Sequence, residues 1–477
     1  MIYCKKCTYP KVAVNLMISD EQICSGCIVH DEKLKADWKE REKKFKEILF
    51  SYKSKNSNYD CIIAVSGGKD SHFQAQYIKS LGLNPLLVNY YTHNYTKVAD
   101  ENLRNIGNAL GIDTYVFYPN KKVIAKMNKI GFVMTGDMNW HLHCGAMTVP
   151  FQIGVRFNIS LVIYGEHGFT DLAGQYSMDD FPEFTKRQRK EEQMRGFTEE
   201  DFIGKEGLEA KDLLFTKYPE DSEIERVGLR GIFMGNYVYW DANKHVKIAM
   251  ELGFKDNPTP YERTYRRFSN VDDIHENGIK DYLKFIKFGY GRCTDHTSKD
   301  IRLGAMTRKK GIELVKKYDH VRPMDSLNYF LETTGMKVEE FDKIADSFRD
   351  KRVWWIADHV LIANKFILLE DVSENETCME ILPGTHKYLN YPFPGYSKKT
   401  IESSGIQPIK CFGKKGTVHI HIGNTLRRLN PVFDSNRLAF YSIFTPGPNI
   451  AIDCEKISKC LNSNFKLENL KEENRKI

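Results

Sequence analysis

The stretch Ser66-Gly67-Gly68-Lys69-Asp70-Ser71 decides how this chain is interpreted. An apolar segment at 59–65 precedes it and predicts a strand, and Phe73 and Tyr77 follow it at helical spacing. The paired glycines allow backbone dihedrals closed to other residues, and the first amides of a helix have no partner within the helix. The stretch therefore predicts an anion-binding turn, in which two serine hydroxyls and the backbone of residues 67–69 hold phosphate groups.

Asp70 lies within this turn, where its carboxylate is expected to hold the magnesium ion that accompanies a polyphosphate. The spacing differs from that of the Walker loop, which has four residues between its first glycine and Gly-Lys-Ser/Thr. An ordinary glycine turn is the plain alternative. We favour phosphate binding because strand, turn and helix all lie where that chemistry needs them.

Bulk composition limits the class of protein. A chain of 477 residues with 41% hydrophobic residues exceeds one core and predicts about two to four domains. No apolar run has the length of a membrane span, the N-terminus does not resemble a signal peptide, and eleven cysteines indicate a reducing compartment, so a cytoplasmic location is expected. A net charge of +7 suits an anionic substrate but equally a mixed surface, and does not indicate nucleic acid.

Four cysteines near the N-terminus form two Cys-x-x-Cys pairs. Cys4 and Cys7 make the first pair, and Cys24 and Cys27 make the second. Two such pairs at this separation predict a zinc ribbon over residues 1–31, with four thiolate ligands and no open position. The predicted role is therefore structural, and metal binding would supply most of the folding energy of so short a segment.

Beyond the ribbon, residues 32–58 predict an amphipathic helix over 31–51 and a polar linker. Strands are then predicted at 59–65, 85–91, 114–118 and 160–164, alternating with helices that include 98–110 and 145–157. This alternation predicts an α/β fold with a doubly wound parallel sheet. Ligands bind outside the carboxyl ends of the strands in such sheets.

Three strand ends should therefore surround one crevice: the turn at 66–71, the segment 89–93 and Gly165-Glu166. His93 could face this crevice, although a lone histidine after a strand is more often structural. Residues 179–218 predict an inserted helical lid or a partner surface, and the basic cluster at 186–190 is expected to be an exposed helix face. Farther along, the segment 292–302 gathers Asp295 and Arg302, and helices are expected to continue to about residue 352.

The turn resembles the pyrophosphate (PP) loop of the ATP pyrophosphatases, Ser-Gly-Gly-x-Asp-Ser. With the zinc ribbon, residues 1 to about 355 resemble the N-acetyl sugar amidotransferases of bacterial surface-polysaccharide, lipopolysaccharide and nonulosonic acid pathways. The further matching stretches are 147–158, 165–166, 287–291, 300–304 and 318–319. Where that family often has an acidic residue and glycines after Gly-Glu, this chain offers Asp171 and Gly174 as counterparts, which leaves the sugar open.

The resemblance implies a PP-loop domain at 59–352 that uses ATP and Mg²⁺, beside a structural Zn²⁺. The acetamido oxygen of an N-acetyl sugar, in free or nucleotide-linked form, would attack the α-phosphate, and ammonia would then displace AMP. Asp70 and Glu166 would be catalytic, although a carboxylate that caps a loop is the alternative role for Glu166. His93, Asp295 and Arg302 would contact the substrate. Since no glutaminase nucleophile motif is evident, partner glutaminase and cyclase-like subunits, or free ammonium, would supply ammonia.

The last part of the chain, 353–477, resembles a different family, the phytanoyl-CoA dioxygenases. The matching segments are 360–369, 381–387 and 416–437, which imply a partial double-stranded β-helix, an all-β jelly-roll-like module. Such enzymes hold iron with two histidines and a carboxylate. Here the upstream His-x-Asp is missing and Arg427 stands where the distal histidine belongs, so we expect an inactive binding or docking module. A rearranged metal site is the alternative, with His359, His386, His419 and His421 as its candidate ligands.

The main alternative function is tRNA modification by thiolation, which also combines zinc knuckles with a PP-loop. That chemistry usually needs a catalytic cysteine in the crevice, and Cys144 and Cys293 are the candidates here. An asparagine-synthetase-like activity and a nucleotide sensor without turnover are weaker alternatives. The sequence favours sugar amidation over all three.

Overall fold

The computed structural model describes residues 2–271 and 273–354, together with the backbone of six short strands between residues 363 and 443. The chain divides into two units, Met1–Trp354 and Trp355–Ile477, which are treated separately. Within the described residues, no helix combines the length and the apolar character needed to span a bilayer.

The first unit is built on a six-stranded sheet of order β3-β2-β1-β4-β6-β5. All neighbouring strands pair in parallel except β5, which runs antiparallel to β6 at the edge. The sheet is thus mostly parallel, as the alternating pattern predicted. Its strands are β1 Cys61–Ala64, β2 Pro85–Tyr90, β3 Thr114–Phe117, β4 Leu161–Tyr164, β5 Glu183–Phe184 and β6 Arg230–Phe233.

Helices cover both faces of the sheet, because the apolar strands alternate their side chains between two cores. Ile62 belongs to one core with residues of α5 and α6. Ile63 belongs to the opposite core with residues of α2, α3 and α4. Both isoleucines are fully buried, so each face of the central strand packs against a helical layer.

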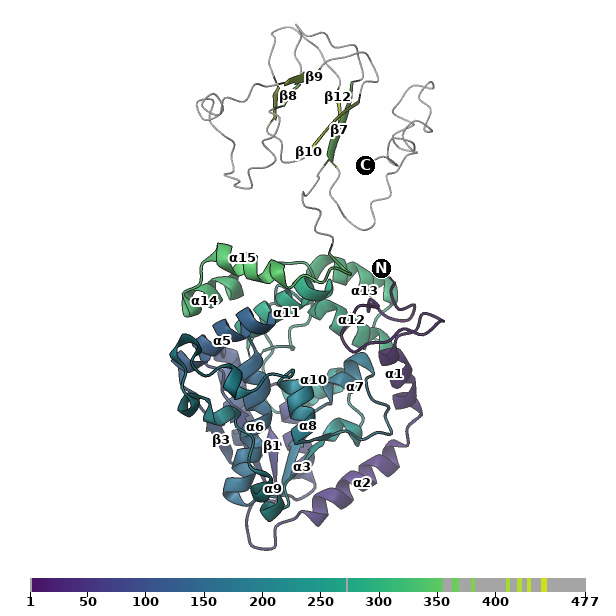
Figure 1. Cartoon of the computed structure of the whole chain (residues 1–477). Coiled ribbons are helices and arrows are strands. Elements are labelled where there is room, and N and C mark those ends of the chain that lie inside the picture. Colours follow the sequence, from purple (N-terminus) through teal and green to yellow (C-terminus); the bar gives the residue numbers. More distant parts are fainter. Residues whose placement is uncertain are drawn as a thin grey trace. The chain divides into compact units, whose positions relative to one another are not determined.

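The chain has fifteen α-helices among its described residues (Figure 1). Five short 3₁₀ or π segments lie between Arg189 and Asn236. The α-helices are α1 Ser25–Lys35, α2 Trp38–Ser51, α3 Lys69–Ser80, α4 Lys97–Leu110, α5 Lys121–Thr135, α6 Trp140–Phe157, α7 Gly168–Ala173, α8 Lys186–Gln188, α9 Asp221–Val227, α10 Ala242–Glu251, α11 Ile274–Phe288, α12 Arg292–Arg302, α13 Arg308–Tyr318, α14 Met324–Thr334 and α15 Val338–Ser347.

Two predicted helix boundaries were wrong. The segment predicted as one helix over 31–51 forms two, because the Asp37 carboxylate accepts hydrogen bonds from the amides of Lys39 and Glu40 and caps a new helix. The helix predicted to begin at residue 145 begins at Trp140. That extra turn is stabilised by long-range packing, since the buried Trp140 ring stacks on Phe202 at 4.1 Å.

The helical lid predicted over 179–218 was also wrong. This segment contains the edge strand β5 and several single turns, and Phe202 and Phe215 are buried in the core beside α6. Within the predicted basic cluster, Arg189 is buried and donates to the hydroxyl oxygen of Thr148. The polar composition concealed a few large apolar residues that fix the segment to the sheet domain.

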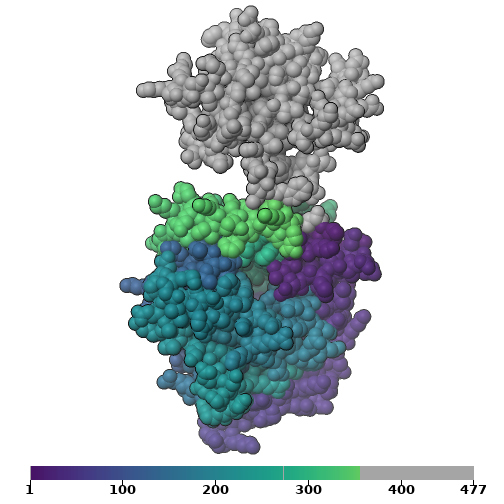
Figure 2. Space-filling model, viewed as in Figure 1, coloured from purple at the N-terminus to yellow at the C-terminus, as the bar shows by residue number. Residues whose placement is uncertain are grey.

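Two additions complete the first unit. Helices α11, α14 and α15 share an apolar core with the end of α5. The N-terminal residues pack against Ala173 of α7 and Tyr290, just before α12. In Figure 2 the purple N-terminal segment lies against the green helical region. The sequence at 1–31 is therefore packed into the unit and is not an appended module.

The described strands of the second unit form two three-stranded antiparallel sheets, β10-β7-β12 and β11-β8-β9. These pairings leave the predicted jelly-roll fold a prediction, because most of 369–438 lies outside the described residues. The strands are β7 Ala363–Leu368, β8 Met379–Ile381, β9 Ile409–Cys411, β10 Val418–Ile422, β11 Arg427–Leu429 and β12 Ala439–Ile443.

Candidate functional site

The predicted phosphate loop joins β1 to α3 at the centre of the sheet. β1 has β2 on one side and β4 on the other, which makes the ends of β1 and β4 the point where the strand order reverses. Gly67 has a φ of +91°, and a Cβ there would lie 3.1 Å from the backbone of Leu103. The loop conformation and its packing therefore both require glycine at this position.

Two serine side chains fix the loop. The Ser66 hydroxyl oxygen accepts from the amide of Gly68 at 3.3 Å, and the Ser71 hydroxyl oxygen accepts from the amide of Ser66 at 3.0 Å. Each hydroxyl proton remains available to donate to a phosphate oxygen. The first-turn amides of α3, which begins at Lys69, receive no side-chain cap, and such unpaired amides bind anions at other helix N-termini.

Asp70 is held as a carboxylate by two cationic or donor groups. The Lys69 ammonium lies 2.5 Å from one carboxylate oxygen, and Nδ1 of His245 lies 2.7 Å from the other. Burial alone would raise the pKa of Asp70, but the Lys69 charge and the His245 hydrogen bond outweigh it and hold that pKa well below its usual range. Asp70 is therefore ionised at neutral pH.

Glu166 follows β4 and shares one lysine with a second carboxylate. The Lys299 ammonium donates to both Glu166 oxygens at 2.9 and 3.0 Å and lies 2.6 Å from an Asp171 oxygen. Burial raises the pKa of Glu166, and the Asp171 and Asp70 charges add to that effect. Burial also opposes ionisation of Asp171, but Lys299 and Lys33 outweigh it and lower its pKa. Glu166 is thus the carboxyl that takes up a proton more readily.

A cavity of about 220 Å³ lies between the loop and α12. It brings residues from the ends of two strands together with residues more than two hundred positions later in the chain. Its lining residues include Ser66, Gly68, Lys69, Asp70, Glu166, Trp240, Arg266, Asp295, His296 and Lys299.

The remaining predicted substrate residues are placed differently from one another. Asp295 lines the cavity, where it pairs with Lys284 at 2.6 Å. His93 lies outside the cavity lining, and its Nε2 donates to the backbone carbonyl of Pro119. Arg302 turns toward the N-terminal cysteines, with Nη2 3.6 Å from Sγ of Cys24.

A row of lysines on α11 continues from Asp295. Lys280, Lys284 and Lys287 recur every three or four residues and so share one helix face. Lys280 has no hydrogen-bond or ion-pair partner among the described residues. Burial lowers the pKa of Lys280 and lowers that of Lys287 to about 8.

Positive charge exceeds negative charge around this row. Five cationic side chains interact there with three carboxylates, so an anionic ligand would relieve the imbalance. The cations are Arg195, Lys280, Lys284, Lys287 and Arg292, and the carboxylates are Asp137, Asp281 and Asp295.

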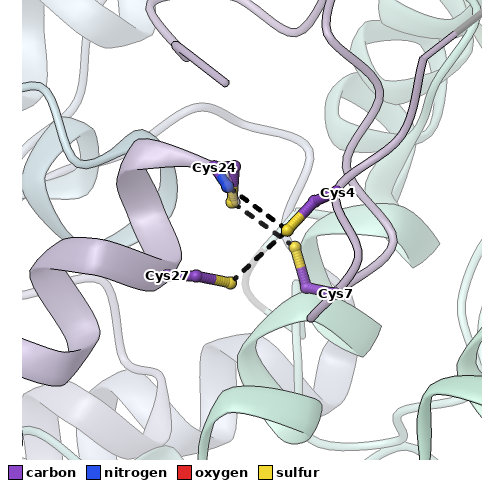
Figure 3. A group of neighbouring side chains, drawn as sticks. All are labelled: Cys4, Cys7, Cys24 and Cys27. Atoms are coloured by element: carbon purple, nitrogen blue, oxygen red, sulfur yellow. Dashed lines mark hydrogen bonds between the residues drawn. The ribbon is translucent and has the colours of Figure 1, made fainter. Parts of the chain in front are cut away.

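The four N-terminal cysteines converge, as Figure 3 shows. Their sulfur atoms all lie within 4.8 Å of one another, with Cys4 and Cys27 at 3.9 Å and Cys7 and Cys24 at 3.6 Å. A tetrahedral zinc ion with bonds of about 2.3 Å places its sulfur ligands about 3.8 Å apart. All four thiols are buried and fit a structural zinc site with no open position.

The two other cysteines considered as catalytic are buried. Cys144 and Cys293 each have no exposed surface, and burial raises the pKa of both thiols. Neither lines the cavity beside the phosphate loop. Thiolate chemistry in the crevice therefore has little support from these residues.

Sequence reasoning did not include His245 or Lys299 among the site residues. His245 lies on α10 and is aligned by stacking on Phe73 at 3.9 Å, a contact that no local pattern indicates. Lys299 had a detectable signal, because it follows Asp295 by four residues and precedes Arg302 by three on one helix. This spacing places Lys299 on the same helix face as the predicted substrate residues Asp295 and Arg302.

Residues 262–366, about a fifth of the chain, match the family model described as "LPS biosynthesis protein WbpG-like, C-terminal domain". An uncharacterized protein, MJ1599, from Methanocaldococcus jannaschii is 33% identical over 95 residues, which are 20% of this chain and 34% of that protein. The chain thus spans about a third of the length of this curated relative.

Solved structures with similarity to this chain include two synthetases. NMN synthetase from Francisella tularensis is 12% identical, with coverage of 64% of this chain and 98% of that one and a TM-score of 0.31. NH3-dependent NAD synthetase from Campylobacter jejuni is 15% identical, with coverage of 47% and 100% and a TM-score of 0.23. At these scores neither likeness carries an argument about function.

Proposed function

We propose that this chain is an ATP-dependent amidotransferase of the PP-loop type. It would adenylate the acetamido group of an N-acetyl sugar and replace the amide oxygen with nitrogen from ammonia, for lipopolysaccharide or a related surface glycan. One observation carries the proposal: the Ser-Gly-Gly-Lys-Asp-Ser turn at 66–71 and a carboxyl group with a raised pKa, Glu166, line the same cavity at the switch point of the sheet.

In the first step, adenylation of the acetamido group, the loop and Asp70 have separate roles. Residues 66–71 would hold the ATP phosphates, and the ionised Asp70 would bind Mg²⁺, which neutralises charge on the phosphates. The acetamido oxygen attacks the α-phosphorus, and the bond to the β-phosphate oxygen breaks. Pyrophosphate leaves, and the product is an O-adenylated imidate whose AMP is a good leaving group.

The second step uses Glu166. As a carboxylate it accepts a proton from ammonium and releases ammonia beside the imidate carbon. Ammonia adds to that carbon, the carbon–oxygen bond breaks, and AMP departs to leave the acetamidino group. The raised pKa of Glu166 brings its basicity closer to that needed to deprotonate ammonium, whereas Asp70 stays a carboxylate throughout.

The acceptor would lie along the lysine row of α11. Lys280, Lys284 and Lys287 extend over about 10 Å of helix and would hold an anionic part of the sugar substrate. This assignment replaces Arg302, whose guanidinium faces the cysteines. Asp295 would orient Lys284 and not contact an anion itself.

The match to a WbpG-like LPS biosynthesis domain supports a glycan substrate, since it covers α11 and α12. In this proposal α11 carries the lysine row that would bind the acceptor, and α12 carries Lys299, which contacts Glu166. A separate glutaminase and a cyclase-like subunit are proposed as the ammonia source. A thiolation enzyme is less well supported because Cys144 and Cys293 are buried outside the cavity.

The test is pyrophosphate release from ATP with ammonium, measured across nucleotide-linked N-acetyl sugars, free N-acetyl sugars and bulk tRNA. Mass spectrometry of each acceptor would follow the exchange of oxygen for an NH group, with AMP formed in equal amount. We expect a sugar to give both signals. Release stimulated by tRNA alone, without any sugar product, would reject sugar amidation and favour thiolation.

A further inference from the structure

The zinc ribbon contacts the helix that carries Lys299 through a set of side-chain hydrogen bonds. The Thr8 hydroxyl lies 2.8 Å from that of Thr297 and 2.9 Å from that of Ser298, both on α12. The Tyr9 hydroxyl donates to Asp295, also on α12, at 2.8 Å. The ribbon therefore contacts the first turn and the middle of this helix.

Arg302 joins the metal centre to both elements around Glu166. Its Nη2 donates toward Sγ of Cys24 at 3.6 Å, and its Nη1 donates to the carbonyls of Asp171 and Leu172 at 2.9 and 3.0 Å. Lys299, one turn earlier on α12, binds the Asp171 carboxylate. One guanidinium thus holds the backbone of α7 at the residue whose side chain binds Lys299.

The space around this guanidinium is closed. A Cβ at Gly26 would overlap the Arg302 guanidinium and lie 2.5 Å from the carbonyl oxygen of Leu172. Gly26 lies in α1 between two zinc-binding positions, Cys24 and Cys27. Only glycine allows the ribbon to approach α7 and α12 closely enough for Arg302 to reach the sulfur.

We propose that the zinc ribbon positions the catalytic groups at the end of β4, with Arg302 as the positioning residue that links the metal centre to Lys299 and Glu166. A zinc ion held by four thiolates leaves negative charge on the sulfurs, and a guanidinium beside them stabilises that charge. When zinc is bound, Arg302 keeps α7 and α12 together, and Lys299 is shared between Glu166 and Asp171. The role rests on the proposed function, because Glu166 acts on ammonia only there.

The decisive variant is Arg302→Met in the full-length, zinc-loaded protein. We expect zinc to remain bound and the KM for ATP to stay unchanged, while kcat for amidine formation falls roughly ten- to hundredfold through misplacement of the catalytic groups. The acidic limb of the kcat profile should move to higher pH, because Lys299 no longer lowers the pKa of Glu166. Amide hydrogen exchange in α7 and α12 should become faster.

Gly26→Ala is the second variant, since alanine suits a helix but displaces the guanidinium. It should reproduce the pH shift and the faster exchange with zinc bound. Arg308→Gln is the matched control: it removes the hydrogen bonds of Arg308 to the carbonyls of Cys4 and Cys7 without touching α7. It should lower the melting temperature but leave the acidic limb in place.

The proposal is overturned if zinc-loaded Arg302→Met and Gly26→Ala keep the parent kcat, acidic limb and exchange rates. It is equally overturned if Arg308→Gln shifts the limb as far as Arg302→Met does. If no sugar is amidated at all, the exchange measurement still decides: faster exchange in α7 and α12 supports the positioning role, and unchanged exchange rejects it. The exchange measurement thus distinguishes an error in the proposed function from an error in the proposed positioning role of Arg302.

Discussion

Asp70 and Glu166 follow adjacent parallel strands, and each has a lysine ammonium against its carboxylate, yet their pKa values move in opposite directions. Asp70 has Lys69 nearby and a second donor, His245. Glu166 has one lysine, and that lysine is also bound by Asp171. Two carboxyl groups in equivalent positions of the sheet thus differ in the direction of their pKa shifts because they receive different numbers of donors.

The difference shows what sets the chemistry at each strand end. Around β1 a single turn of six residues supplies the glycines, the hydroxyls, the carboxylate and one lysine. Around β4 the carboxylate comes from the strand end, but the group that tunes it lies 133 residues farther along the chain. The groups around Asp70 at the end of β1 are therefore close together in the sequence. The environment of Glu166 at the end of β4 depends instead on the position of α12.

Asp70→Asn should have the largest effect of these substitutions, because it removes the carboxylate that follows β1. The carboxamide carries no charge for Mg²⁺, so pyrophosphate release should fall at least about a hundredfold, equivalent to roughly 3 kcal/mol of transition-state stabilisation. Stopped-flow measurement of pyrophosphate release would check this. Asp221→Asn, at an exposed ion pair on α9, is the control with parent activity. Full activity in Asp70→Asn would place the magnesium elsewhere.

Glu166→Gln should separate the two steps. Gln keeps the shape and an oxygen acceptor for Lys299 but cannot take a proton, so amidine formation should slow by about a hundredfold. The first turnover of pyrophosphate should survive, and a rapid-quench experiment would detect the accumulated adenylated sugar. If pyrophosphate release fell as far as amidine formation, Glu166 would belong to the first step instead.

Lys299→Met should widen the difference in pKa between Asp70 and Glu166, which the pH dependence of activity would report. In the parent protein amidine formation should be lost as pH falls through the raised pKa of Glu166, because the protonated acid cannot accept a proton. Removal of the Lys299 charge raises that pKa further, so the acidic limb should move to higher pH. A kcat profile for each protein checks the direction, and a shift to lower pH would contradict the pairing.

Lys280→Met should have the smallest effect on activity, because it leaves the groups around Asp70 and Glu166 unchanged. Loss of one charged contact should raise the KM for the sugar about tenfold, with little effect on the KM for ATP. In the parent protein the sugar KM should rise above about pH 8, where Lys287 loses its charge. Lys316→Met, on the exposed side of α13, is the matched control. An unchanged sugar KM would remove α11 from the acceptor site.

Local patterns predicted the parallel sheet and the loop because Ile62 and Ile63 face opposite cores and because the turn at 66–71 needs only neighbouring residues. The convergence of the four cysteines also followed from their spacing. Arg302 was assigned to substrate because a basic residue near a crevice suits an anion. Its real neighbour, Cys24, is 278 residues away, and no spacing rule reaches across that distance.

The docking of Thr8 on Ser298 also has a consequence for biosynthesis. The two residues are 290 positions apart, so a ribosome that adds about 5–20 residues each second needs roughly 15–60 s to deliver the surface on which the first-made segment rests. During that interval the four cysteines have only one another and the zinc ion that we propose they bind. Zinc supply during translation should therefore govern how much of the newly made chain matures, and starvation for zinc should act on nascent protein before it acts on finished protein.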